Sequence, residues 1–267
     1  MAAAKAAGED VPLWMPVLLI VAGLASYGAT IDLPFVFDDH TAIIDNANIR
    51  QLWPLTVSAG APVQSAMAGR PVVALSLALN YAVGELSPSV YHAWNLGLLI
   101  LTALVLFGIV RRTLLLPRLR DRFGKSSAFI ACACALLWIV HPLQTELVDY
   151  VTQRTESMAG LFVLAAVYAA LRDTEAAHGW RWRAASIAAC AAGMACKETA
   201  AVAPLLRRDV EDEGIGGAIF RLPGGPEPGE RVEQDVDRWS IEAFVVARRP
   251  RGKGVGRPGA ALPRWSV

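Results

Sequence analysis

Long runs without a charged side chain constrain this sequence more than any other feature. Residues 11–31 contain no Asp, Glu, Lys or Arg, and further uncharged runs occupy 86–110, 126–145, 157–171 and 184–196. A helix needs about 20 apolar residues to cross the ~30 Å hydrocarbon core of a bilayer. The sequence therefore predicts an all-α, polytopic membrane protein with about five transmembrane helices, of which the last two are short.

The composition agrees with a membrane protein. Hydrophobic residues make up 54% of the chain and charged residues 18%, whereas soluble domains carry roughly 25% charged residues. The formal net charge is +1, so no overall field attracts nucleic acid, and no nucleic-acid partner is expected. The four cysteines (Cys132, Cys134, Cys190 and Cys196) all lie in apolar runs, which favours free buried thiols over a metal site.

Lysine and arginine in the connections predict the orientation in the membrane. The connection 111–125 holds six basic residues, and the one after the fourth run carries Arg172, Arg181 and Arg183. Basic loops stay in the cytoplasm, so both connections and the N-terminus are expected there. The remaining connections are then non-cytoplasmic: 32–85, 141–156 and the end of the fifth run near 197.

One apolar stretch inside the long outer connection is too short to span. Residues 69–84 read "GRPVVALSLALNYAVG" and predict an interfacial or re-entrant helix. Pro71 suits the first turn of such a helix, because proline lacks the backbone N–H that this turn leaves unpaired.

Polar residues from four segments of these outer connections are thus predicted on one membrane face. They include Asp38, Asp39, His40, Arg70, Tyr91, His92, His141, Glu146, Arg154, Glu156, Lys197 and Glu198. Arg154 and Glu156 are expected at membrane depth, because the fourth run is short without them. Ionisable groups there are costly and usually face a protein-lined or water-filled cavity. This mixture of acids and bases predicts a shared functional cavity, and ordinary polar flanks of the helices are the alternative.

The aspartate pair has two further interpretations. Asp38 and Asp39 precede "HTAII", and a carboxylate there could cap the segment that follows. A metal site made of Asp38, Asp39 and His40 is weak, because consecutive side chains rarely converge on one ion. The sequence has no P-loop, no GxGxxG after a strand and no GxSxG, so nucleotide and serine-hydrolase functions have no support.

The other candidates also have structural alternatives. His141 with Pro142 could simply end the third run, since proline interrupts helices. Arg154 could form an interhelical ion pair with Glu146 or Glu156. The Lys197 side chain could extend to the membrane interface.

Four sequence blocks in a fixed order carry a family resemblance. They are "FVFDDHTAIIDNANIR", "GRPVVALSLALNYAVG" followed by "YHAWNLGLL", "HPLQTELVDYVTQRTESMAGLFVLAAVY", and "GMACKETAAVAPLL". The chain, over about residues 12–206, resembles the N-terminal membrane half of the GT-C fold glycosyltransferases with C-terminal tetratricopeptide repeats. This family includes the transmembrane O-mannosyltransferases.

The resemblance implies a function at the outer membrane face. The donor would be a polyprenyl-phosphate-linked sugar, such as mannose, and the acceptor a hydroxyl of a protein or glycan. The acidic catalytic motif of the family maps onto Asp38 and Asp39, where a carboxylate can act as general base. No soluble cofactor is implied, a divalent metal stays open, and no metal ligands are assigned.

The remaining polar residues become candidate substrate-binding groups. Basic side chains should meet the anionic leaving phosphate, and Arg70, His141, Arg154 and Lys197 lie on the predicted face. The acids near them complete the set: Glu146, Glu156 and Glu198.

The sequence changes character after Leu206. Residues 207–267 are rich in Arg, Gly, Pro and acids and contain neither an apolar run nor a 34-residue repeat. We expect a partial GT-C-like membrane domain at 1–206 and a polar, low-order tail at 207–267, either frameshifted or a disordered cytoplasmic tail.

Two alternative functions stay open beside the glycosyltransferase. One is a catalytically inactive, truncated membrane fragment or assembly partner. The other is a small transporter with Arg154 and Glu156 in a polar pathway.

Overall fold

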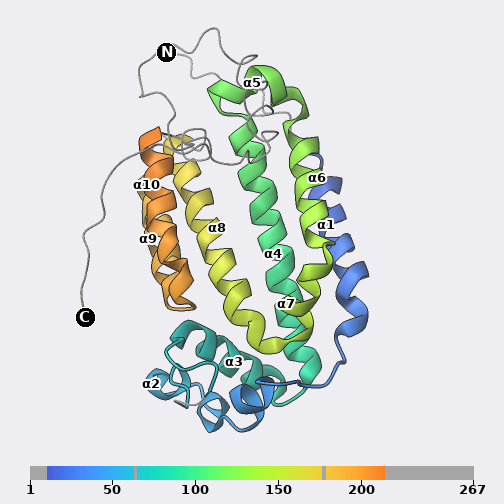
Figure 1. Cartoon of the computed structure of the whole chain (residues 1–267), viewed down its shortest axis with the longest axis vertical. Helices are drawn as coiled ribbons and strands as arrows, with labels where there is room; N and C mark the ends of the chain where they lie inside the picture. Colours follow the sequence, from blue (N-terminus) through green and yellow to red (C-terminus); the bar gives the residue numbers. More distant parts are fainter. Residues whose placement is uncertain (1–10, 63–64, 176–178, 214–267) are drawn as a thin grey trace, which may run out of the picture. The chain divides into compact units, whose positions relative to one another are not determined.

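The computed structural model describes residues 11–62, 65–175 and 179–213. These residues all lie in the first of two units, Met1–Arg221, and the second unit, Leu222–Val267, is outside the described residues. The described segments are helical and contain no β-strand, which confirms the all-α fold class (Figure 1).

The described residues form the following helices. The α-helices are α1 (Trp14–Tyr27), α2 (Leu55–Ser58), α3 (Pro71–Gly84), α4 (Pro88–Leu114), α5 (Pro117–Phe123), α6 (Ser127–Ile139), α7 (Thr145–Asp149), α8 (Arg154–Glu175), α9 (Trp180–Met194) and α10 (Ala203–Glu213). Short 3-10 turns lie at η1 (Gly28–Thr30), η3 (Ala47–Arg50), η4 (Gly124–Ser126), η5 (Pro142–Gln144), η6 (Val151–Gln153) and η7 (Glu198–Val202). One π-helical turn is η2 (His40–Ile44).

Three helical segments in the described ranges are long and apolar enough to cross a membrane: Pro88–Leu114, Pro117–Ile139 and Val151–Thr174. The segment Trp14–Thr30 is apolar but shorter, and α9 has 15 residues. The expected count of five spans is therefore not confirmed. The fourth run is longer than its uncharged residues, because Arg154 and Glu156 lie in the first turn of α8.

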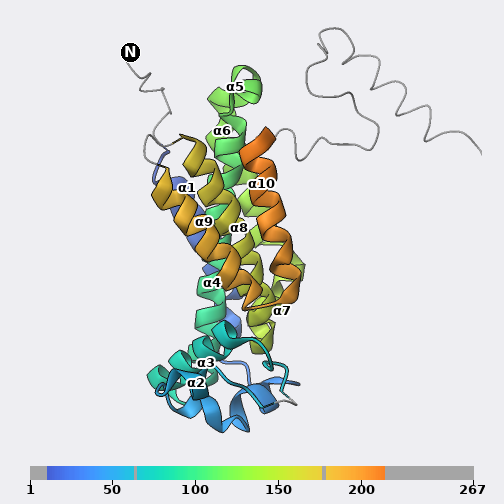
Figure 2. The same ribbon diagram turned by 90° about the vertical axis from the view of Figure 1, so that its left-hand side faces the viewer.

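The long helices lie side by side in one bundle. In Figures 1 and 2, α4, α6 and α8 run along its length, with α2 and α3 at one end and α5 at the other. Helix α8 packs against α9 and α4, and α4 also packs against α6. The interfacial helix predicted at 69–84 is α3, with Pro71 in its first turn as expected.

The connections that were predicted to share one face do meet at the α3 end of the bundle. A single apolar core joins the first long connection, α3, the start of α8 and the segment after α9. Its buried members include Ile43, Val73, Val151, Met158 and Cys196. Segments far apart in sequence are thus held together by apolar burial, which is non-directional and needs only close packing.

Two features of the sequence are placed differently from expectation. Cys132, Cys190 and Cys196 are free and buried as expected, whereas Cys134 is free but exposed. Cys132 and Cys134 are two apart on α6, and residues at this spacing point to different sides of a helix. The expected boundary at 206/207 lies inside α10, and the division into 1–206 and 207–267 stays a prediction.

Gly23 allows α1 to approach α4 and α6 closely. A Cβ atom at this position would lie 2.9 Å from Ile100 Cγ1 and 3.0 Å from Ile139 Cδ1. We expect Gly23→Val to lower the free energy of unfolding by about 1–3 kcal/mol, because it overfills this contact. Detergent unfolding followed by circular dichroism would measure the change. Gly28→Val is the control, since a Cβ at Gly28 has open space, and equal losses in both variants would contradict the packing argument.

Candidate functional site

The aspartate pair follows a backbone turn that separates the two carboxylates. Phe37 has a φ of +48°, which is rare for a bulky residue, and its side chain is 82% exposed. Such a conformation persists only where the surrounding contacts hold it. Beyond this turn the Asp39 side chain is fully buried, at 0% exposure, while Asp38 is exposed. The two residues therefore have different environments despite being adjacent.

The Asp39 carboxylate joins the first connection to the start of α8. It accepts backbone hydrogen bonds from Thr152 at 2.8 Å, Val36 at 3.2 Å and Val151 at 3.3 Å. Val151 and Thr152 open the helical turn that leads into α8, where unpaired N–H groups and the helix dipole favour an anion. Burial raises the pKa of Asp39, and these three backbone N–H groups act in the opposite direction.

The interpretation of Asp39 as a local cap is wrong. It occupies the N-cap position of η2 but makes no side-chain capping bond there. Its carboxylate instead caps a helix whose first residues are more than a hundred positions away in sequence. Sequence spacing could not reveal this, because the partner segment is brought close only by tertiary packing.

Asp38 lies beside an aromatic pair. The rings of Phe37 and Tyr150 meet edge to face, with centroids 5.8 Å apart. The Tyr150 hydroxyl interacts with the Asp38 carboxyl group. Burial raises the pKa of Tyr150, and the negative charge of Asp38 contributes in the same direction. An exposed carboxylate and a phenol thus share one small surface region.

Arg154 is fully buried and bound by neutral acceptors. It donates to Asn95 Oδ1 at 2.7 Å, Asn80 Oδ1 at 2.5 Å and the Tyr91 carbonyl oxygen at 3.1 Å. These acceptors come from α3 and α4, so the guanidinium joins three helices. The alternative of an ion pair with Glu146 or Glu156 is wrong, because neither carboxylate is among its partners.

Two of the predicted acids find other partners. Lys197 forms an ion pair with Glu156, which connects the segment after α9 to the first turn of α8. Glu146 accepts a hydrogen bond from the Gln153 side chain at 3.3 Å. The structure therefore brings Lys197 and Glu156 together directly, although they are 41 positions apart.

The other predicted residues lie nearer the surface. Arg70 is half-buried, and its Nη1 donates to the Ala66 carbonyl at 2.8 Å while its Nε has no partner. His141 is exposed, and its Nδ1 accepts from the backbone N–H of Leu143. Glu198 is exposed.

Two buried polar residues of α4 were not among the predicted site residues. His92 is buried, and its ring nitrogens lie 2.9 Å from the Val148 carbonyl oxygen and 3.0 Å from that of Leu33. Asn95 donates to the Leu147 carbonyl at 3.2 Å while it accepts from Arg154. His92 and Asn95 are three apart on α4, so they share one helix face. That spacing, within an otherwise apolar run, was the available signal.

The described ranges contain no group of three or more His, Cys, Asp or Glu residues able to hold a metal ion. The interpretation of Asp38, Asp39 and His40 as a metal site thus gains no further ligand among those residues.

Comparison with known proteins identifies relatives of this chain. It is 35% identical over 159 residues to protein O-mannosyl-transferase TMTC3 of Mus musculus, covering 56% of this chain and 16% of that protein. The human TMTC3 is 30% identical over 191 residues, which cover 68% of this chain and 20% of that protein. Protein O-mannosyl-transferase Tmtc1 of Drosophila melanogaster is 32% identical over 251 residues, which cover 88% of this chain and 27% of that protein.

The chain is homologous to the protein O-mannosyl-transferases. The resemblance drawn from four sequence blocks is thereby confirmed, and with the three apolar helices it supports a membrane protein.

The chain spans about a fifth of the length of these relatives, between 16% and 27%. The alignment with Drosophila Tmtc1 covers 88% of this chain, which is more than residues 1–206 alone make up. It therefore extends into residues 207–267. No protein-family model matches the chain. No solved structure matches it either.

Proposed function

We propose that this chain forms the acceptor side of a membrane glycosyltransferase that uses a polyprenyl-phosphate sugar, with mannose as the sugar. Its relatives are named protein O-mannosyl-transferases, which supports a sugar donor and a protein acceptor. The acceptor group in this proposal is a hydroxyl, and the reaction takes place at the non-cytoplasmic face. The basic connection 111–125, with six Lys and Arg residues, supports that orientation.

One observation carries the proposal: Asp38 is exposed while its neighbour Asp39 is locked into the fold. In this mechanism the Asp38 carboxylate takes the proton of the acceptor hydroxyl. The hydroxyl oxygen then attacks the anomeric carbon of the sugar, and the bond to the polyprenyl phosphate breaks. Asp39 acts as a positioning residue, because its three backbone hydrogen bonds fix the loop that presents Asp38.

The leaving phosphate needs cations at the same end of the bundle. Lys197, beside Glu156 at the start of α8, and the half-buried Arg70 are the proposed phosphate partners. His141, Glu146 and Glu198 are proposed to contact substrate from the exposed connections. Arg154 is proposed to act indirectly, since its guanidinium holds α3 and α4 against α8 and so fixes the walls around Asp38.

Sugar transfer by the full chain tests this function. The chain would be reconstituted in liposomes with polyprenyl-phosphate mannose and a serine- and threonine-rich peptide, and mannosylated peptide would be measured by mass spectrometry. Asp38→Asn is expected to lower the rate at least a hundredfold, consistent with the usual contribution of general base catalysis, roughly 10²–10⁴-fold. Asp45→Asn is the matched control, because Asp45 is an exposed carboxylate in the same connection.

The outcomes separate the candidate functions. Unchanged transfer by Asp38→Asn would show that another group is the base. No transfer by the unaltered chain would favour the second candidate, a non-catalytic membrane segment or assembly partner, which the short coverage of the relatives motivates. The transporter hypothesis would need a solute flux that Arg154→Ala abolishes.

A further inference from the structure

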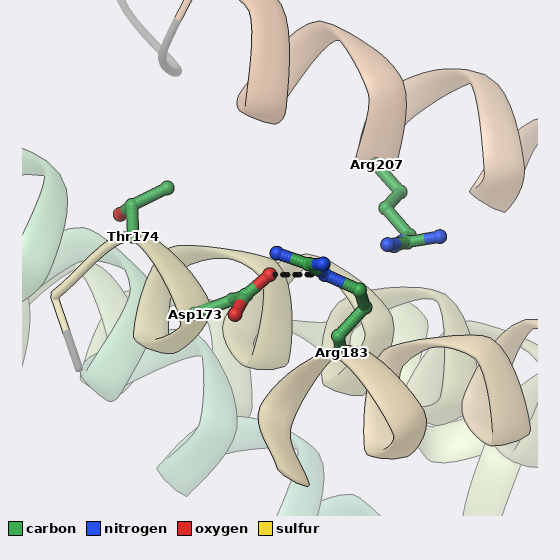
Figure 3. A pocket seen from close by; sticks show the side chains of 4 residues that line it. All are labelled: Asp173, Thr174, Arg183 and Arg207. Atoms are coloured by element: carbon green, nitrogen blue, oxygen red, sulfur yellow. Dashed lines mark hydrogen bonds and ion pairs between the residues drawn. The ribbon is translucent and has the colours of Figure 1, made fainter. Parts of the chain in front are cut away.

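A second polar region lies far from the aspartate pair, at the opposite end of α8. A cavity of about 430 Å³ is lined there by Asp173, Thr174, Arg183 and Arg207. These residues come from α8, α9 and α10, so three helices form the wall. In Figure 3 the Arg183 guanidinium lies between Arg207 on the right and Asp173, to which a dashed line joins it, with Thr174 farther to the left.

The charge of this lining favours an anion. Arg183 Nε donates to Asp173 Oδ2 at 3.1 Å, which uses one of the five N–H donors of the guanidinium. The Arg183 side chain is still 61% exposed, whereas that of Asp173 is only 7% exposed. Two arginines line the cavity, and the Arg fork matches the oxygen geometry of a phosphate.

The depth of the cavity points to the membrane surface. The spanning segment Val151–Thr174 ends at Thr174, which itself lines the cavity. A span ends where the hydrocarbon core gives way to the headgroup layer. We therefore expect Thr174 and its neighbours at the level of lipid phosphates.

Aromatic and cationic residues around the cavity agree with this depth. Arg172 lies over the Trp182 ring at 4.6 Å, and Arg181 lies over the Trp180 ring at 5.8 Å. Trp180 is 67% exposed. Tryptophan rings gather at the headgroup level of membranes, which agrees with this depth.

We propose that this cavity binds the phosphate group of an anionic phospholipid from the adjacent leaflet. Arg183 and Arg207 hold the phosphate oxygens, while Thr174 only lines the wall, because its hydroxyl donates to the Leu171 carbonyl oxygen at 2.8 Å. Asp173 orients Arg183 and weakens binding through its negative charge. The bound lipid thereby connects the end of α8 and the start of α9 to α10.

Native mass spectrometry of the full chain in mild detergent tests this binding site, with phosphatidylglycerol as the probe and phosphatidylcholine as the reference. We expect stronger retention of phosphatidylglycerol, and roughly tenfold weaker binding in Arg183→Gln or Arg207→Gln, in line with loss of a charge-assisted hydrogen bond. Asp173→Asn should have the opposite effect and strengthen binding, because it removes the repelling carboxylate.

Arg181→Gln is the matched control, since Arg181 is an exposed arginine on the same helix that does not line the cavity. Equal weakening by Arg181→Gln and Arg183→Gln would overturn the site in favour of general surface charge. Weaker binding in Asp173→Asn would also overturn it. Displacement of the lipid by millimolar inorganic phosphate would show a soluble-anion site instead and contradict the lipid assignment.

Discussion

Arg154→Met is expected to lower the free energy of unfolding of the full chain by about 3–5 kcal/mol, the range for breaking a buried charged network. Methionine keeps an unbranched side chain as far as the position of Nε but is shorter and cannot donate. The Asn80 and Asn95 side-chain oxygens and the Tyr91 carbonyl oxygen would then lose a charged donor inside the protein. Each such buried acceptor left unpaired costs about 1–3 kcal/mol.

Unfolding in mild detergent with added sodium dodecyl sulfate, followed by circular dichroism, would measure this loss. Arg181→Met is the control, because it makes the same change at an exposed position of α9. Arg154→Lys should recover only part of the stability, since an ammonium lacks the planar fork that reaches acceptors on α3 and α4. A loss below about 1 kcal/mol in Arg154→Met would contradict the role of Arg154 in joining these helices.

Asp39→Ala is expected to have the second largest effect, a loss of about 2–4 kcal/mol, because it leaves the N–H groups of Val36, Val151 and Thr152 without their acceptor. Two of these groups open the helical segment of α8, so the anion cap is lost as well. The same unfolding assay would measure the effect, and protease cleavage of the 32–50 connection would report its release.

Asp38→Ala is the natural control for this variant. It removes the same group from the adjacent residue, but Asp38 is exposed, so its stability should stay within about 0.5 kcal/mol of the unaltered chain. The pair therefore separates structure from chemistry: Asp39→Ala should lose stability, and Asp38→Ala should lose only transfer. Equal stability of the two variants would refute the division of roles.

Most of the helical architecture could be predicted from local sequence. Uncharged runs mark the bilayer-crossing helices, and Pro71 marks the start of α3, because both signals depend on neighbouring residues alone. Span lengths were harder to predict. Residues 157–171 are too short to span alone, which is why Arg154 and Glu156 were expected at membrane depth, and α8 includes both. A buried arginine is tolerated there because neutral acceptors of other helices satisfy it.

The candidate site could be predicted only in outline. Charge patterns gathered the right connections at one end of the bundle, and the shared core of 42–49, α3, the start of α8 and 196–200 agrees. The partners were wrong for Arg154 and for the capping role of Asp39, because one sequence does not show which distant backbone groups will lie within hydrogen-bonding distance. Asn95 was missed, and His92 was expected on this face but without its carbonyl partners, for the same reason.

The sequence by itself determined that this is a helical chain built for a membrane, with four blocks that resemble the family to which its homologues belong. Hydropathy and motif order are properties of the chain, and they survive without any contact being known. Only the tertiary structure decided that Asp39 is buried against the start of α8 and that Asp38 is left exposed beside Tyr150. Two identical, adjacent side chains differ only through their surroundings, and those surroundings come from residues more than a hundred positions away.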